Sequence, residues 1–198
     1  MSNSKNKSRR VAVLALFTAV TVVLQVLSYF VKIGMFNLSL VLVPIVLSGI
    51  LYGASVSAYM GAVFGIITVI GCVSGIDAGG AILFQASPLL TVLICLLKGT
   101  LAGFVSGLIA RLFSKKAPTL STFLAAAAAP VVNTAVFIAM TLLFFKDILY
   151  TWAAGTNLVT YVITGLVGVN FLFELALNLI LAPTLLRVSK ILKKQLKI

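Results

Sequence analysis

The sequence predicts an all-α integral membrane protein with six transmembrane helices and both termini in the cytoplasm. Apolar residues make up 62% of the 198 positions and charged residues only 9%, against about 25% charged residues in a typical soluble domain. Uncharged segments recur at lengths near the roughly 20 residues that a helix needs to cross a bilayer. The cations are also unevenly distributed along the chain, and this distribution predicts which ends of the helices face the cytoplasm.

The first half of the chain accommodates three helices. Residues 11–31 carry no charge and predict the first helix. Residues 33–76 are also uncharged and are long enough for two shorter helices, with the cut expected at 48–57, where glycine and tyrosine supply turn chemistry. The glycine-rich segment 71–80 is then expected to be a loop.

The second half of the chain predicts three longer helices. The fourth is expected to begin at Pro88, because proline suits the first turn of a helix. Polar breaks separate it from the two helices that follow, at 114–119 and 146–157. The predicted helices are 88–113, 122–145 and 158–187.

The cations place both termini in the cytoplasm. With six helices the two termini share a side, and twelve of the 15 basic residues gather there. Only Lys32 and Lys146 fall on the other side, and Lys98 lies within a helix. Cytoplasmic loops are enriched in Lys and Arg. We therefore expect one transmembrane domain over 1–198, with basic cytoplasmic segments at 1–10 and 188–198, and no nucleic-acid partner.

The composition also argues against an enzyme. The chain has no histidine and only three acids, and it lacks the GxxxxGK[ST] loop of many ATPases. Cys72 and Cys95 lie in apolar segments and are expected to be small buried residues rather than a disulfide or metal ligands. No cofactor and no metal site is predicted. If the protein moves a solute uphill, another protein supplies the energy.

Five polar residues at membrane depth are the candidate binding residues. Polar groups are costly there and usually face a cavity or a partner. Lys98 lies about 15 Å along the fourth helix, near the bilayer midplane. Asn133 follows Pro130 in the fifth helix, and Asn170, Glu174 and Asn178 recur every four residues on one face of the sixth.

Two interpretations of these residues remain open. Lys98 and Glu174 pair with each other while the asparagines bond between helices, or all five line a pocket for a small polar solute. The number of polar groups exceeds what one ion pair needs, which favours the pocket.

Small residues on the fourth predicted helix favour close helix packing. Gly99, Gly103 and Gly107 recur at intervals of four and allow close helix approach.

Four stretches of the chain resemble the substrate-specific S component of energy-coupling factor (ECF) transporters. They are NLSLVLVPIVLSGILYG (37–53), SPLLTVLICLLKGTLAG (87–103), PVVNTAVF (130–137) and GLVGVNFLFELALNLILAP (165–183). Six helices in under 200 residues without an ATPase motif fit this family as well. The likeness covers most of residues 10–190.

The resemblance implies a small vitamin bound from outside, a prokaryotic plasma membrane, a membrane T component and two cytoplasmic ATPases. It places the pocket in the outer half, beneath the loops 32–38, 71–87 and 146–157. Polar residues of these loops, Asn37, Gln85 and Asn157, therefore join the candidate binding residues. By the same resemblance, Ala15 and Ala19 of an AxxxA spacing would contact the T component.

The chemistry of the candidate pocket leaves the substrate between two vitamins. Lys98 favours a carboxylate, and pantothenate supplies one together with hydroxyls and an amide, so pantothenate is preferred. Glu174 instead favours the amine or pyridine nitrogen of vitamin B6 forms. The alternative function is a stand-alone secondary transporter or channel for a small polar solute that uses Glu174 as its titrating group.

Overall fold

The computed structural model describes residues 2–33, 36–114 and 116–196 and shows an all-α membrane bundle. Five helical segments in this part of the chain are long and apolar enough to span a bilayer, and a shorter apolar helix accompanies them. The long elements are α1 (Ser2–Ser28), α3 (Ala54–Val73), α5 (Pro88–Phe113), α6 (Pro118–Phe144) and α9 (Val169–Leu196). The shorter ones are α2 (Leu42–Tyr52), α4 (Ala78–Ala86), α7 (Lys146–Ala153), α8 (Leu158–Tyr161) and the π-helical segment η1 (Val162–Gly168).

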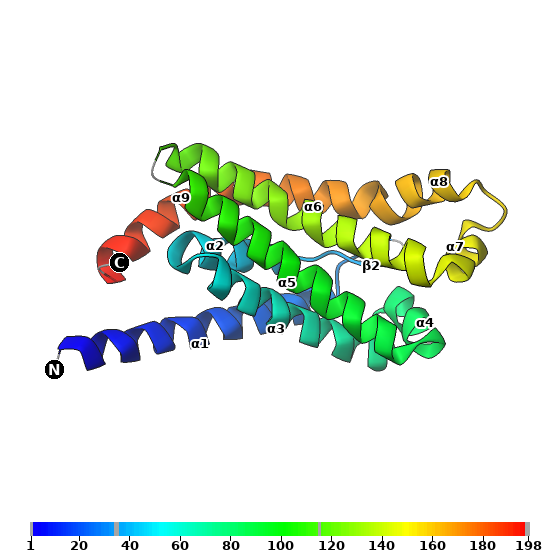
Figure 1. Ribbon diagram of the computed structural model, residues 1–198, viewed down its shortest axis with the longest axis horizontal. Coiled ribbons are helices and arrows are strands. Elements are labelled where there is room, and N and C mark those ends of the chain that lie inside the picture. The colour runs from blue at the N-terminus through cyan, green and yellow to red at the C-terminus, as the bar shows by residue number, and fades with distance from the viewer. Residues whose placement is uncertain (1, 34–35, 115, 197–198) are drawn as a thin grey trace.

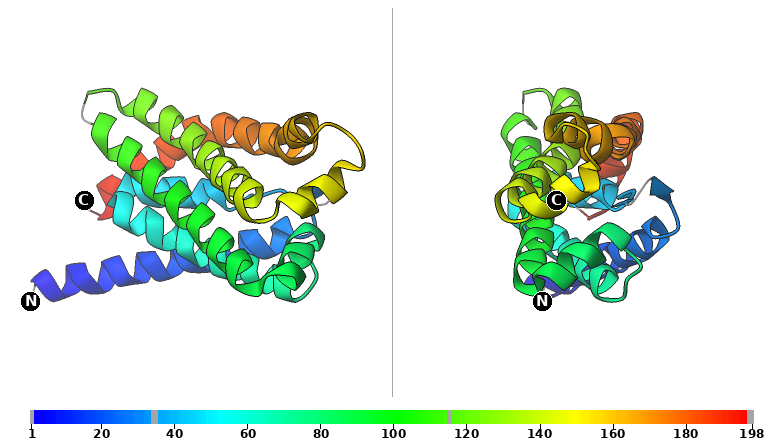
Figure 2. Two further views of the ribbon diagram at one scale, coloured as in Figure 1. Left: turned by 45° about the vertical axis from the view of Figure 1, so that its right-hand side comes forward. Right: turned by 90° about the vertical axis from the view of Figure 1, so that its right-hand side faces the viewer.

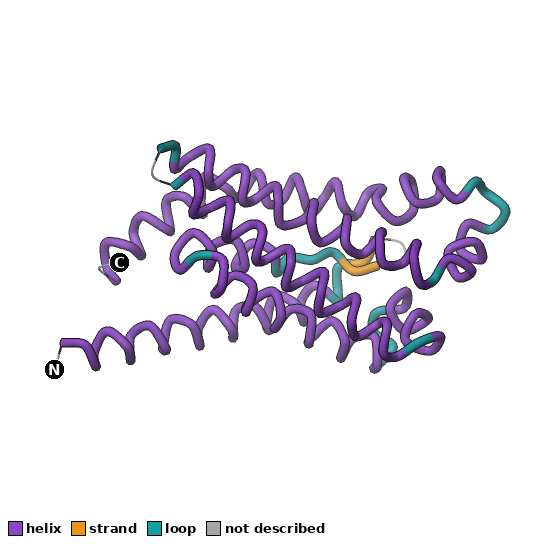
Figure 3. Tube along the Cα trace, in the orientation of Figure 1, coloured by secondary structure: helices purple, strands orange, loops and turns teal. Residues whose placement is uncertain are grey.

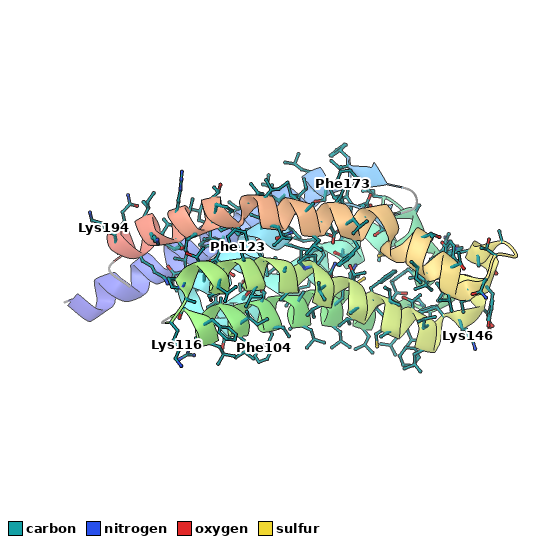
Figure 4. All side chains as sticks on the ribbon, turned by 90° about the horizontal axis from the view of Figure 1, so that it is seen from above. Phe104, Lys116, Phe123, Lys146, Phe173 and Lys194 are labelled. Atoms are coloured by element: carbon teal, nitrogen blue, oxygen red, sulfur yellow. The ribbon has the colours of Figure 1, made fainter. Side chains whose placement is uncertain are left out.

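The two chain ends lie at the same end of the bundle (Figures 1 and 2), as an even number of crossings requires. The opposite end carries α4, α7 and α8. Lys116 and Lys194 lie at the end with the termini and Lys146 at the other, whereas Phe104 and Phe173 lie along the sides of the bundle (Figure 4). Both phenylalanines are exposed. This distribution matches a bilayer-spanning bundle with an apolar outer surface.

The second crossing of the bundle is only partly helical. At 1.5 Å per residue the 11 residues of α2 extend about 16 Å, roughly half of a hydrocarbon core. The strands β1 (Lys32–Ile33) and β2 (Phe36–Asn37) form a small antiparallel hairpin before it. Figure 3 shows these strands alongside the long helices rather than beyond their ends. Non-helical backbone at such a depth is tolerated where protein buries it or where it lines a cavity.

Three consecutive backbone donors of this irregular segment, at residues 38–40, have partners outside a regular helix. Leu38 N–H donates to the Val31 carbonyl at 3.0 Å, and Leu40 N–H donates to Ser28 Oγ at 3.0 Å. Ser39 N–H donates to Glu174 Oε1 on α9 at 2.7 Å. The segment is therefore held by α1 on one side and α9 on the other.

Glycines let α5 pack closely against α3, as the spacing of small residues predicts. Gly99 of α5 and Gly61 of α3 face each other with their backbones in contact, and Gly107 meets the Ala54 Cα at the start of α3. A Cβ added to Gly99 would overlap the Gly61 carbonyl oxygen and approach Phe64 Cδ1 at 3.0 Å. On its other side α5 packs against α6, and α6 packs against α9.

We expect Gly99→Ala to destabilise the protein by about 1–3 kcal/mol, the usual cost of overpacking a closed interior contact. The neighbour is backbone, so it cannot move aside as a side chain does. Thermal unfolding in detergent measures the effect. Gly168→Ala is the control, because the nearest described atom that its added Cβ would meet is the Ile163 carbonyl oxygen, at 3.8 Å. Equal melting temperatures for the two variants would contradict the close packing.

The sequence analysis places several boundaries correctly and two loops wrongly. The break at Gly53, where φ is +89°, falls inside the expected cut, and the fourth predicted helix has the bounds of α5. The expected loop 71–80 instead contains the end of α3 and the start of α4, whose N-cap Asp77 accepts a bond from Gly80 N. The expected loop 146–157 contains α7. Helices α1 and α9 also extend through the basic segments that flank the predicted spans.

Candidate functional site

A cavity lies beside the non-helical segment that precedes the short helix α2. Its wall is formed by α3, α5, α6 and α9, by α4 with its N-cap Asp77, and by Asn37 and Ser39 of the segment before α2. Its accessible volume is about 80 Å³, which is room for several water molecules at about 10–15 Å³ each. Five of the predicted binding residues line it: Asn37, Lys98, Asn133, Asn170 and Glu174. Their role in binding stays a prediction.

Lys98 places an ammonium group in this cavity between aromatic rings. Its Nζ lies 5.7 Å from the centroid of Phe64 on α3 and 5.2 Å from that of Phe137 on α6. These contacts give part of the stabilisation that water would supply to the cation. Within the described part of the chain no salt bridge joins Lys98 to Glu174. The structure therefore does not form the Lys98–Glu174 pair that the sequence left open.

Glu174 has its own backbone partner. The residue is 4% exposed, and its Oε1 accepts the Ser39 N–H at 2.7 Å. Ser39 is 8% exposed. Because the bond joins α9 to the segment between β2 and α2, it holds together two walls of the cavity that are far apart in the sequence.

We expect Glu174→Leu to lower the stability of the unliganded protein by about 1–3 kcal/mol, the cost of leaving the buried Ser39 N–H without an acceptor. Glu174→Gln keeps an acceptor oxygen at the same position and should lose much less. Thermal unfolding of both variants in detergent, without ligand, compares them. Equal stability of the leucine and glutamine variants would show that the bond to Ser39 contributes little.

Two asparagines leave amide groups available in the cavity. Asn133 is 5% exposed, and its Oδ1 has no hydrogen-bond partner among the described residues. The same is true of both amide atoms of Asn37. Buried amides are normally bonded to protein or to water. Such groups suit a ligand that carries hydroxyl or amide groups of its own.

Three predicted binding residues lie elsewhere. Gln85 and Asn157 are exposed, and neither is among the residues that line the cavity. Asn157 instead caps α8, where its Oδ1 accepts the Val159 N–H at 2.9 Å. Asn178 is fully buried one turn beyond Glu174, and its Nδ2 donates to the Glu174 carbonyl at 2.8 Å. The regular spacing of the polar stripe on α9 extends past the end of the cavity.

The cavity also contains residues that the sequence analysis did not assign to it. Thr68 and Cys72 of α3, Thr91 and Cys95 of α5, and Asp77 line it. A periodic signal was present, since Thr91, Cys95 and Lys98 share one helix face, as do Thr68 and Cys72. These residues are small or weakly polar. Their spacing therefore identifies them as cavity-lining residues only once Lys98 is known to face a cavity.

Two further observations concern the rest of the predicted site residues. Ala15 and Ala19 are both exposed on α1, so their side chains are open to a partner. No group of three or more His, Cys, Asp or Glu residues in the described chain is placed to hold a metal ion.

Comparison with known proteins adds one match. A family model described as "ECF transporter, substrate-specific component" matches residues 9–186. A search of curated proteins gives no match. The matched range includes every residue that lines the cavity.

Proposed function

The chain belongs to the substrate-specific components of ECF transporters, and we propose that it captures a small water-soluble vitamin bearing a carboxylate, with pantothenate preferred over vitamin B6 forms. Membership of the family makes it a transport subunit that binds a small molecule and works with a T component and ATPases. The identity of the vitamin is the part that we argue from the cavity.

The charge state of the cavity wall carries the proposal. The two acids already accept backbone donors: Glu174 from Ser39 N–H, and Asp77 Oδ1 from Gly80 N–H at 3.0 Å. Among the described residues Lys98 forms no salt bridge, and its Nζ lies over the faces of Phe64 and Phe137. Lys98 is half-buried, and a cation at membrane depth is stabilised by a direct ion pair, which a ligand carboxylate would supply. Lys98 is therefore the charged group of the wall that is left to make a direct contact with a ligand, which favours an acid over an amine.

The neutral groups of the wall support the same choice. Asn133 Oδ1 can accept a ligand hydroxyl or N–H group, and the Asn37 amide can both donate and accept. Pantothenate carries a carboxylate, hydroxyls and an amide. A ligand with only an amine or a pyridine nitrogen would leave Lys98 without a counter-ion.

We also propose that the T component contacts α1 through Ala15 and Ala19. Both alanines are exposed and lie on one helix face at a spacing of four. Small residues at this spacing allow close packing between membrane helices. A face that contacted only lipid would have no need of them.

Calorimetric titration of the full chain in detergent tests the vitamin. Pantothenate, pyridoxal, pyridoxamine, riboflavin, thiamine and folate are added separately, without nucleotide. Tight binding of pantothenate alone is the expected result. Binding of pyridoxal or pyridoxamine instead would assign recognition to the acids and overturn the preference for Lys98.

A second measurement separates capture from transport by the chain alone. We expect no solute flux into liposomes that contain only this chain, whatever proton gradient is applied. Gradient-driven flux that Glu174→Gln abolishes would establish the stand-alone transporter and contradict dependence on an ATPase.

A further inference from the structure

Two free cysteines meet in the wall of the cavity. Cys72 of α3 is 3% exposed and Cys95 of α5 is 4% exposed, and both line the cavity. Their Sγ atoms lie 4.0 Å apart. They are the only two cysteines of the sequence. A disulfide requires about 2.05 Å between the sulfurs, so the thiols must approach by about 2 Å to form one.

The packing around the two thiols indicates which helix segment would move to bring them together. Near Cys95 the two helices already touch, since a Cβ on Gly65 of α3 would lie 2.6 Å from the Cys95 carbonyl oxygen. Cys72 lies in the last turn of α3, next to the turn that contains Gly75, where φ is +77°. The closing movement therefore falls on the end of α3 rather than on the closely packed α3–α5 contact.

Helix α4 rests on Cys72 and would move with it. The Cys72 Sγ occupies the space that a Cβ of Gly80 would need, so thiol and α4 backbone are in contact. Asp77, Gly80 and Leu83, at the start of α4 and along it, line the same cavity as Lys98. A displacement of Cys72 toward α5 narrows the cavity between α4 and the Lys98 side of the wall.

We propose that Cys72 and Cys95 form an oxidisable dithiol and that their conversion to a disulfide weakens substrate binding. A two-electron oxidant of the diazene class supplies the chemistry. One thiolate adds to the N=N bond, and the other attacks the sulfur of this adduct, which forms the S–S bond and releases the hydrazine. The two electrons and two thiol protons pass to the hydrazine, so the step is balanced. The consequence for binding rests on the proposed capture function; the disulfide itself does not.

The first experiment needs no ligand. The full chain in detergent is treated with diamide, and its thiols are counted after denaturation. We expect loss of both thiols, an intact mass lower by two hydrogen atoms and no cross-linked dimer. Hydrogen exchange of the α4 amides should change on oxidation and return with dithiothreitol. Two remaining thiols, or α4 exchange that does not respond to a formed disulfide, would overturn the proposal.

The second experiment measures pantothenate affinity before and after oxidation. We expect a loss of about 10-fold, within the usual range of coupling between two sites, with recovery on reduction. Pantothenate should slow oxidation to a corresponding extent, because coupling is reciprocal. Cys72→Ser and Cys95→Ser are the controls: neither can form the disulfide, and diamide should leave their affinity unchanged. Equal affinity of the reduced and oxidised protein would contradict the proposal.

The two proposals fail in different ways. If pantothenate binds neither form, the vitamin assignment is wrong, while thiol counting and α4 exchange still decide whether the dithiol closes and moves the wall. If pantothenate binds the reduced protein and diamide changes neither thiols nor affinity, the capture function stands and the dithiol proposal is wrong.

Discussion

Lys98→Met is expected to weaken pantothenate binding by at least about 30-fold, which corresponds to about 2 kcal/mol at the low end for a buried charged contact. Among the described residues that line the cavity, Lys98 is the only basic one, and it has no salt-bridge partner in that part of the chain. Methionine keeps a side chain of similar length against Phe64 and Phe137, so the change removes mainly the charge. Lys98→Ala should show a similar loss. Titration calorimetry of the purified variants measures it.

Lys146→Met provides a matched control. Lys146 also lies over an aromatic ring, with its Nζ 5.8 Å from the centroid of Tyr150, but it belongs to α7 and lies outside the cavity lining. Its substitution should leave pantothenate affinity unchanged within about 2-fold, as for a surface change away from the site. Unchanged affinity of Lys98→Met would remove Lys98 from substrate recognition, and with it the main reason to prefer a carboxylate.

The main spans could be predicted because bilayer insertion depends on local properties. Length and hydropathy define each long helix, so α5 matches its predicted bounds and α8 begins at the predicted Leu158. Short elements follow different rules. Helix α4 has the capping residue Asp77 at its start, and α7 lies within the predicted polar break 146–157. The glycine-rich composition of 71–80 and the polar composition of 146–157 both predict loops. In α4 a local hydrogen bond from the cap outweighs this tendency, and in α7 an amphipathic face does.

The lining of the cavity was predictable mainly where a charged or amide side chain lies in an apolar helix. Lys98 and Glu174 are conspicuous in apolar helices, and the structure places both in the cavity wall. Their separate partners could not be predicted, because the bond from Ser39 to Glu174 joins residues 135 positions apart. Asn157 and Gln85 were assigned by loop membership alone, which does not determine whether a side chain turns inward. The contact between Cys72 and Cys95 likewise depends on how α3 and α5 pack.

One face of α1 is buried against the bundle and the other is open. Phe17, Thr21, Gln25 and Ser28 form the buried face, and α1 packs mainly on α3 and also contacts α2. Ala15 and Ala19 lie on the exposed face together with large apolar residues such as Val23 and Val26. The two alanines project less from the helix than their large neighbours. Such a surface allows a second membrane helix to approach closely.

Ala15→Trp and Ala19→Trp are therefore expected to reduce ATP-dependent uptake by at least about 10-fold, or about 1.4 kcal/mol of lost association with the T component. Vitamin binding by the isolated chain should stay within about 2-fold of normal, because neither alanine lines the cavity. Ile180→Trp, at an exposed position of α9, controls for the bulk of tryptophan in the bilayer and should support normal uptake. Proteoliposomes that contain the T component and both ATPases provide the assay. Normal uptake by both alanine variants would place the T component on another face, whereas lost vitamin binding would show that α1 supports the cavity instead.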